Sequence, residues 1–107
     1  MTPQNLTFDG ADMWVINGAS QNVTELRASD GEILGTLPLI GIPLDIVFDG
    51  ANMWISNFDL HSLTKLRVCD GINLGRFATG GHFPEGLVFD GTDVWVANTS
   101  GNSVAKM

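Results

Sequence analysis

Short apolar runs separated by polar turns recur along the chain, and one seven-residue segment occurs three times. Its copies are FDGADMW at 8–14, FDGANMW at 48–54 and FDGTDVW at 89–95. The phenylalanines lie 40 and then 41 residues apart, and a fixed period of this size is typical of one supersecondary unit repeated along a chain. We therefore expect three equivalent repeats.

Each repeat predicts short antiparallel strands joined by tight turns. A proline precedes the first apolar run, where a residue that cannot donate to a ladder belongs. Asp-Gly then supplies a turn, because glycine accepts positive φ and aspartate bonds its own backbone. The third run alternates apolar and polar residues, as at 23–27, which is the period of a half-buried strand. A second Asp-Gly leads into a fourth strand.

The expected strands follow from these signals, and no stretch shows a sustained helical period, so no helix is expected. The first strands are 6–8, 46–48 and 87–89, the second 13–16, 53–56 and 94–97, the third 23–27, 63–67 and a run from Val104, and the fourth 33–37 and 73–77.

Four short strands per repeat with a recurrent aromatic signature are typical of a β-propeller blade. The chain resembles bacterial propeller repeats of the NHL and YVTN type, including the virginiamycin B lyase-like group. In these repeats a proline-led inner strand, an Asp-Gly turn and a Trp-Val strand recur, as in Trp14-Val15 and Trp95-Val96. The resemblance covers nearly all 107 residues and implies an all-β fold. It leaves the function open, since related propellers serve as lyases, lactonases, sensors and scaffolds.

The chain is expected to form one partial β-propeller domain, 1–107, of about 2.75 blades. Blade 1 spans about 3–38 and blade 2 about 43–78, while blade 3, about 84–107, lacks its outermost strand. Propellers usually have about 4 to 8 blades, so three cannot close a ring. The bare flanks would expose more apolar surface than a soluble monomer usually tolerates. We expect two copies to join head to tail as a homodimer of six blades; the alternative is that the chain is a fragment of a longer propeller.

The composition narrows the choice of partners. A formal net charge of -7 and scattered basic residues disfavour nucleic acid and anionic membranes, because phosphate contacts need clustered Lys and Arg. Cys69 is the single cysteine, which excludes an intrachain disulfide and a zinc-type cysteine cluster. No apolar stretch approaches the roughly 20 residues of a membrane helix and no signal-peptide pattern is present, so a cytoplasmic location is the default and no compartment is assigned.

Polar residues concentrate in the loops that a propeller would gather on one rim of its channel, where ligand sites commonly lie. They are Asn17, Gln21, Asn22, Asn57, Asp59, His61, His82, Glu85, Asp45, Asn98 and Asn102. Asn17, Asn57 and Asn98 occupy one position of the repeat. Asparagine at such a position caps a loop with its amide; the alternative is that these three side chains bind a small polar ligand.

Acid–base chemistry has one candidate group, formed by His61, His82 and Glu85, because histidine titrates near neutrality and a carboxylate can orient it. The resemblance to the lyase-like group implies a histidine, a glutamate and Mg²⁺, which points to His82 and Glu85. Neither histidine recurs in the other repeats, so a surface-loop role is the competing interpretation. No catalytic residue is assigned.

Metal binding has little support in the sequence. The turn acids Asp9, Asp12, Asp49, Asp90 and Asp93 would suit Ca²⁺ by chemistry, but their spacing lacks a dedicated calcium loop and turn formation explains them. No metal ligand and no cofactor is assigned. Trp14, Trp54 and Trp95 are interpreted as packing elements between blades.

The leading functional hypothesis is a noncatalytic propeller module that binds or scaffolds and completes its ring by homodimerisation. The rival is a metal-dependent small-molecule enzyme of the streptogramin lyase or lactonase type. A third possibility is a segment of a longer propeller sensor.

Overall fold

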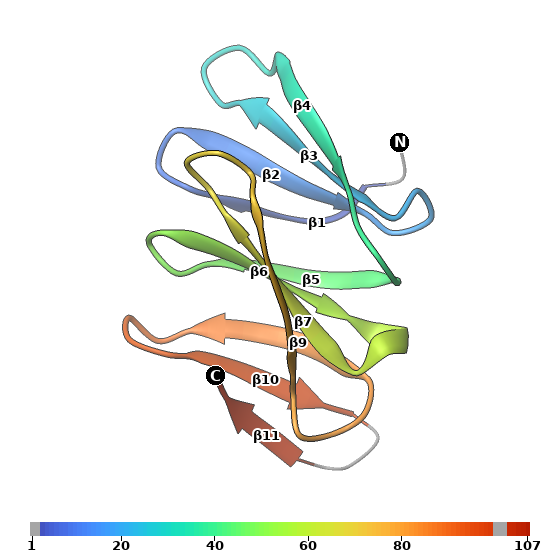
Figure 1. Cartoon of the computed structure of the whole chain (residues 1–107). Coiled ribbons are helices and arrows are strands. Elements are labelled where there is room, and N and C mark those ends of the chain that lie inside the picture. The colour runs from blue at the N-terminus through green and yellow to red at the C-terminus, as the bar shows by residue number, and fades with distance from the viewer. Residues whose placement is uncertain (1–2, 100–102) are drawn as a thin grey trace.

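The chain folds into three antiparallel sheets, seen in a computed structural model that describes residues 3–99 and 103–107 (Figure 1). We call these sheets blades 1, 2 and 3. Blade 1 holds β1 (Pro3–Phe8), β2 (Asp12–Asn17), β3 (Asn22–Arg27) and β4 (Ile33–Pro38). Blade 2 holds β5 (Pro43–Phe48), β6 (Asn52–Asn57), β7 (Ser62–Arg67) and β8 (Asn73–Ala78). Blade 3 holds β9 (Pro84–Phe89), β10 (Val94–Asn98) and β11 (Ser103–Lys106). The expected all-β class is confirmed, and the sheets have the form of partial propeller blades.

Within the described residues the strands are joined by one short helical turn and no α-helix, as expected. Phe58–Leu60 forms a 3-10 helix, η1, in the loop between β6 and β7. A single 3-10 turn needs no amphipathic period, so the sequence pattern does not reveal it. His61 ends this turn in the left-handed region, with φ 52°, and Gln21 has φ 54° at the same point of blade 1. Within the described residues, no helix is long and apolar enough to cross a membrane.

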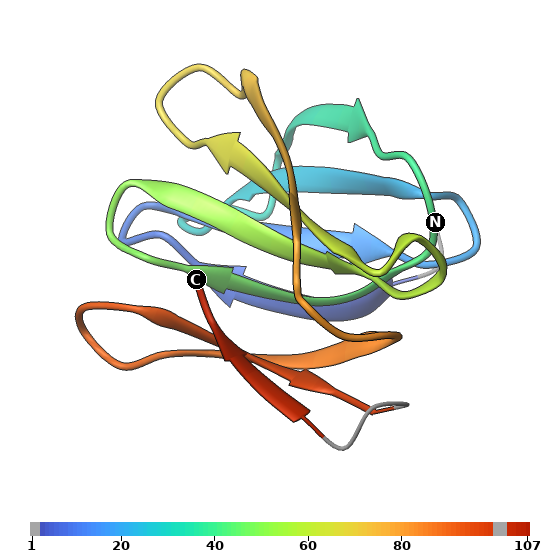
Figure 2. The ribbon, with the colours of Figure 1, turned by 60° about the horizontal axis from the view of Figure 1, so that its bottom comes forward.

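The first strands of the three blades lie next to one another, with β1 beside β5 and β5 beside β9 (Figures 1 and 2). Asp45 on β5 ties these strands together. Its carboxylate accepts hydrogen bonds from Asn5 Nδ2 on β1 (2.5 Å) and from the backbone N–H of Leu87 on β9 (2.9 Å). The later strands of each blade fan outward from this inner row.

The hydrophobic core lies between blades. The core between blades 1 and 2 consists of Trp14, Ile16, Val23, Leu39, Ile46, Met53, Ile55 and Leu66. The core between blades 2 and 3 consists of Trp54, Leu63, Leu87, Val94 and Val96. Strand residues alternate between the two faces of a sheet, so each blade contributes to two cores when it has two neighbours. Only blade 2 has both neighbours within the described chain.

The leading face of blade 1 is uncovered along β1, although Val15, which pairs with Leu6, stays buried. Leu6 is 54% exposed, whereas Ile46 and Leu87, which hold the same position in blades 2 and 3, are 4% and 7% exposed. Phe8 is also exposed on β1. The position is therefore buried wherever a preceding blade exists.

The trailing face of blade 3 is uncovered in the same way. Val104 is 68% exposed, whereas Val23 and Leu63 at the same position are fully buried. Trp95 and Val88 are also exposed on this face. The two open faces therefore correspond to the two sides of the interface that the chain forms between blades 1 and 2 and again between blades 2 and 3.

An aspartate clamps each first turn and the tryptophan that follows it. Asp49 Oδ1 accepts hydrogen bonds from the backbone N–H groups of Ala51 (2.9 Å) and Asn52 (2.7 Å). Its Oδ2 accepts one from the indole Nε1 of Trp54 (2.7 Å). Asp9 holds Trp14 and Asp90 holds Trp95 through the same set of bonds. Asp9, Asp49 and Asp90 therefore serve the turns, as the sequence predicts for them.

Partial burial pushes the pKa of Asp49 upward, but the hydrogen bonds from Trp54 and Asn52 outweigh it and the pKa lies below its ordinary value. On the open flank, hydrogen bonds from the N–H of Asp93, the indole of Trp95 and the N–H of Thr92 lower the pKa of Asp90 to about 2. The fold therefore stabilises the ionised form of Asp49 and of Asp90.

We expect Asp49→Ala to lower the free energy of unfolding by about 2 kcal/mol, because it leaves the indole N–H of Trp54 without a partner inside the core. In the unpaired chain Asp90→Ala is the matched control, since it removes the same bonds from Trp95, whose exposed ring can bond water. Urea denaturation of both variants at a dilution where sedimentation shows a single chain measures the difference. Equal losses would contradict a role of the clamp in the core.

Candidate functional site

The three repeated asparagines are buried at the ends of β2, β6 and β10. Asn17 Nδ2 donates to Asn22 Oδ1 (2.7 Å) and to Thr24 Oγ1 (3.1 Å) on the neighbouring strand. Asn98 Nδ2 donates to Ser103 Oγ (3.3 Å) and to the carbonyl of Thr79 (3.4 Å). Each amide therefore bonds its own blade.

Two of these amides, those of Asn57 and Asn98, also reach the connection that enters their blade. When the side-chain amide of Asn57 is rotated so that its oxygen and its nitrogen both have hydrogen-bond partners, the nitrogen donates to the carbonyl of Ile40 (3.3 Å). Asn98 Nδ2 donates in the same way to the carbonyl of Thr79. Gly81 permits this close approach, because a Cβ there would lie 2.8 Å from Asn98 side-chain atoms. Oδ1 of Asn17 and Oδ1 of Asn98 are buried without a partner among the described residues. Binding of a polar ligand by Asn17, Asn57 and Asn98 stays a prediction.

His61, in the loop between β6 and β7 of blade 2, lies beside His82, on the connection from β8 to β9. Their ring centroids are 4.7 Å apart in an edge-on arrangement. His61 Nδ1 accepts a hydrogen bond from the backbone N–H of Phe83 (3.0 Å). His82 is exposed, and Glu85 is exposed on β9. In the described part of the chain, His61, His82 and Glu85 do not bring three ligand atoms within 4.8 Å of one another. Of the predicted rim, Asn102 lies outside the described residues.

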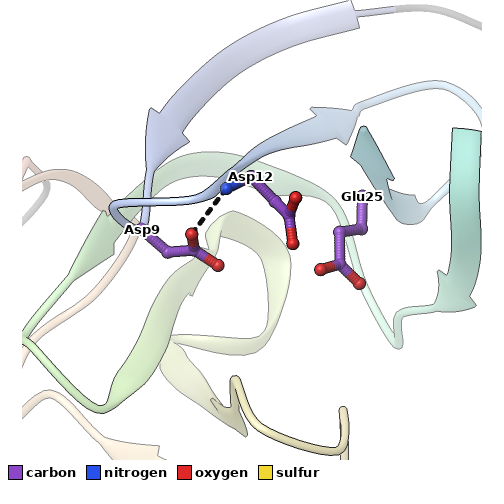
Figure 3. Close-up of side chains that lie close together, drawn as sticks. All are labelled: Asp9, Asp12 and Glu25. Carbon is purple, nitrogen blue, oxygen red and sulfur yellow. Dashed lines mark hydrogen bonds between the residues drawn. The ribbon is translucent and has the colours of Figure 1, made fainter. Parts of the chain in front are cut away.

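A cluster of three carboxylates in blade 1, which the sequence interpretation missed, lies at the start of β2 (Figure 3). Asp9, Asp12 and Glu25 each place a carboxylate oxygen within 4.8 Å of the others, and all three side chains are half-buried. We call this the blade 1 acid cluster. Oxygen ligands at this spacing suit a hard divalent cation by chemistry.

The repeat alignment explains why the cluster is peculiar to blade 1. Glu25 faces Trp14 across β2 and β3, and at the same register Lys65 faces Trp54 and Lys106 faces Trp95. Lys65 Nζ lies 4.8 Å from the Trp54 ring and Lys106 Nζ 5.9 Å from the Trp95 ring. Glutamate at a position that is lysine in the other two repeats is the signal that a sequence comparison could have used.

The acid cluster strongly perturbs the ionisation of Glu25. Burial, a hydrogen bond to Asp12 and the negative charges of Asp12 and Asp9 raise the pKa of Glu25 to about 7. In Asp9, hydrogen bonds from the N–H of Asp12 and the indole of Trp14 outweigh the opposing effect of burial and lower the pKa. The blade 1 acid cluster therefore favours the protonated form of Glu25, at the position where the other two blades carry a lysine charge.

Glu25 also lines a cleft of about 360 Å³ between the outer parts of blades 1 and 2. Its walls include Trp14, Leu34, Gly35, Cys69 and Asp70. Cys69 is a free, exposed thiol. The cleft is therefore bordered by carboxyl groups from both blades.

Comparison with known proteins places the fold. No protein-family model matches the chain, and no curated protein sequence matches it. Solved structures do match. A functionally unknown protein from Desulfotomaculum acetoxidans DSM 771 aligns with a TM-score of 0.83 and 19% identity over 95% of this chain and 36% of its own. Virginiamycin B lyase from Staphylococcus aureus aligns with a TM-score of 0.85 and 15% identity over 99% of this chain and 38% of its own. Kuenenia stuttgartiensis hydrazine synthase aligns with a TM-score of 0.79 and 21% identity over 90% of this chain and 29% of its own.

These identities establish a shared fold, and the resemblance to the propeller group that includes virginiamycin B lyase is confirmed at that level. The chain spans about a third of the length of the matched structures, from 29% to 38% in these three. Their activities belong to those proteins.

The raised pKa of Glu25 predicts a pH dependence of folding. From its ordinary value near 4.5 up to about 7, the unfolded chain ionises Glu25 while the folded chain keeps the proton. Stability from this residue is therefore complete below pH 4.5 and is lost as the pH rises through 7. We expect Glu25→Gln to melt a few degrees above the natural protein at pH 8 and to show a flatter profile between pH 5 and 7.

Differential scanning calorimetry across that pH range checks this expectation. Glu85→Gln, which changes an exposed glutamate on β9, is the matched control and should keep the profile of the natural protein. A profile for Glu25→Gln that parallels the natural one would show that the cluster does not hold a proton.

Proposed function

We propose that this chain is a noncatalytic binding or scaffold module of the propeller type that completes its ring by pairing with a second copy of itself. The observation that carries this proposal is the complementarity of its two open flanks. The leading face of a blade is the one turned toward the preceding blade; it is buried in blades 2 and 3 but open along β1 in blade 1. The trailing face is the one turned toward the following blade; it is buried in blades 1 and 2 but open in blade 3.

The internal interfaces supply the geometry of the proposed one. Between blades 1 and 2, Ile46 and Met53 pack on the face that carries Trp14. The counterparts on the two open faces are Leu6 and Met13 in blade 1 and Trp95 in blade 3. Blade 1 of one copy would therefore lie on blade 3 of the other as blade 2 lies on blade 1.

The energy favours closure by two chains. A fully buried large apolar side chain contributes about 1.5–3 kcal/mol. Each seam, by which we mean the contact of blade 1 of one copy with blade 3 of the other, would cover several such side chains, including Leu6, Phe8, Trp95 and Val104. A two-fold ring forms two such seams for one loss of translational and rotational freedom. Six blades also fall within the usual range of propellers, about 4 to 8.

In this arrangement the repeated asparagines Asn17, Asn57 and Asn98 would lie at equivalent points around one end of the ring, and a small polar ligand would bind there. Nucleic acid and membranes are not expected partners, since the chain has a net charge of -7.

We expect the natural protein to sediment as a dimer at tens of micromolar, and Leu6→Asp and Trp95→Asp each to give folded monomers, because each buries a charge in both seams. Ile40→Asp is the matched control, since Ile40 is 67% exposed on the connection between blades 1 and 2. Sedimentation velocity measures the state, and circular dichroism checks the fold. A well-folded, monodisperse monomer of the natural protein would overturn the proposal and favour a segment of a longer propeller.

A second candidate function, a metal-dependent small-molecule enzyme of the streptogramin lyase or lactonase type, is favoured by one observation. His61 and His82 meet with ring centroids 4.7 Å apart, next to the loop that leads to Glu85. In this case His82 and Glu85 would act as acid and base beside a divalent ion such as Mg²⁺.

This candidate predicts that Mg²⁺ binds the natural protein and that His82→Ala weakens that binding at least about tenfold, which isothermal titration calorimetry measures. Gln21→Ala, at the position of His61 in blade 1, is the matched control and should bind as the natural protein does. Absence of Mg²⁺ binding, or no effect of His82→Ala, removes the enzyme alternative.

A further inference from the structure

Blade 3 holds a cation among the residues of its first turn. Lys106 Nζ on β11 lies 3.8 Å from Asp93 Oδ2 and 5.9 Å from the centre of the Trp95 ring. The hydrogen bond from the N–H of Asp93 is the largest cause of the lowered pKa of Asp90, and the charge of Lys106 adds to it. We call this place, where the turn acids, the tryptophan and the third strand meet, the turn corner of a blade. In blade 3 the turn corner therefore binds an ammonium group of the chain itself.

The turn corner of blade 2 also holds an ammonium group. Lys65 Nζ on β7 lies 4.8 Å from the centre of the Trp54 ring and 5.9 Å from that of the Phe77 ring. Lys65 and Lys106 have the same register, since each pairs with the tryptophan of the second strand. The charge distribution of an indole ring attracts a cation placed beside it. Two of the three turn corners are therefore occupied by a lysine.

The turn corner of blade 1 has the same acids without the ammonium group. Its turn acids and its tryptophan, Asp9, Asp12 and Trp14, match those of blade 3 in type and position. Glu25 takes the position of the lysine, and its carboxyl group faces that of Asp12 (Figure 3). The residues that surround a cation in blade 3 thus meet a third carboxyl group in blade 1.

The basic residues nearest to this corner are engaged elsewhere. Arg27, the basic residue of β3, pairs with Asp30 (3.2 Å) and Glu32 (2.8 Å) in the following turn. On the facing turn of blade 2, Arg67 pairs with Asp70 (2.7 Å). Within residues 3–99 and 103–107, no ion pair involves the blade 1 acid cluster. A cation for the turn corner of blade 1 would therefore come from outside the chain.

The turn corner of blade 1 opens into the cleft of about 360 Å³ between blades 1 and 2, which Glu25 and Trp14 line. The apolar walls of this cleft include Leu34, Leu37 and Val68. Leu37 stands at the position of Phe77, so a smaller side chain lies where blade 2 places a ring against its tryptophan. A cleft of this size admits a small molecule. Apolar walls suit an aliphatic chain, whereas a hard metal ion prefers oxygen ligands and water.

We infer that the cleft between blades 1 and 2 binds a small organic cation, a primary ammonium group on a short aliphatic chain. The blade 1 acid cluster holds the ammonium group, and the chain lies against Leu34, Leu37 and Val68. The ligand supplies the charge that Lys106 supplies in blade 3. None of the residues that line this cleft belongs to the two open faces of the chain, so the site does not depend on pairing of copies.

The test uses n-butylammonium, which has the four carbons and the ammonium group of a lysine side chain. It is titrated into the natural protein at about pH 8, above the pKa of Glu25, while NMR follows the indole N–H signals of the three tryptophans. We expect the Trp14 signal to shift saturably with a Kd on the order of 1 mM, as suits a ligand of five heavy atoms. The signals of Trp54 and Trp95 should stay in place, because each already has a lysine beside it.

Three further probes separate the parts of the ligand. Neutral n-butanol keeps the chain without the charge and should leave the Trp14 signal in place at the same concentration. Methylammonium keeps the charge without the chain and should bind at least about tenfold more weakly, because it lacks the methylene groups that meet the walls. Ca²⁺ tests the acid cluster as a metal site. An equal response to n-butanol, or a response to Ca²⁺ without one to n-butylammonium, overturns the inference.

Variants of the protein locate the site. Glu25→Lys installs the lysine of the other blades and should abolish binding while the protein melts no lower than the natural one. Glu25→Gln keeps the size of the side chain without its charge and should weaken binding about tenfold, which also serves the test if Glu25→Lys does not fold. Glu85→Gln, on β9, is the matched control and should bind as the natural protein does. Unchanged affinity in Glu25→Gln, or an unmoved Trp14 signal in the natural protein, overturns the inference.

Discussion

Every sheet of this protein is apolar on both faces, and the rest of the structure depends on covering both. Adjacent residues on one strand show the requirement, since Met53 and Trp54 point to opposite faces of β6 and both are buried. In blade 3 the same pair splits, because Val94 is buried and Trp95 is exposed. A blade is thus not a self-sufficient unit of folding; it becomes one only between two others.

The aspartate clamp makes the faces interchangeable. In every blade one carboxylate holds two backbone N–H groups and one indole, so the turn and the tryptophan are fixed together, as for Asp9 with Trp14 and for Asp49 with Trp54. Blades built this way present nearly the same leading and trailing surfaces. An interface between two blades of one chain is therefore a template for an interface between two chains, with no new chemistry needed.

The strands could be predicted because they depend on local pattern: each observed strand lies within a few residues of the expected one, and the Asp-Gly turns stand where expected. The features that escaped prediction depend on where loops meet. His61 and His82 belong to different loops, and only the path of the chain brings their rings together. The acid cluster escaped for another reason. The alternation of β3 identifies Glu25 as a polar position, but not the corner of the blade that it shares with Asp9 and Asp12.

Repetition also separates residues that the fold explains from those that it does not. The Asp-Gly turn and the tryptophan recur in every blade, and the same hydrogen bond joins them each time. Position 25 does not follow the repeat: lysine lies over the indole in blades 2 and 3, while blade 1 places a glutamate against two other carboxyl groups. Folding alone would favour lysine there, because it neutralises the turn acids and covers the ring. Burial and the two neighbouring carboxylates instead raise the pKa of Glu25, so the outer corner of blade 1 is where this chain departs from the pattern of its other two blades.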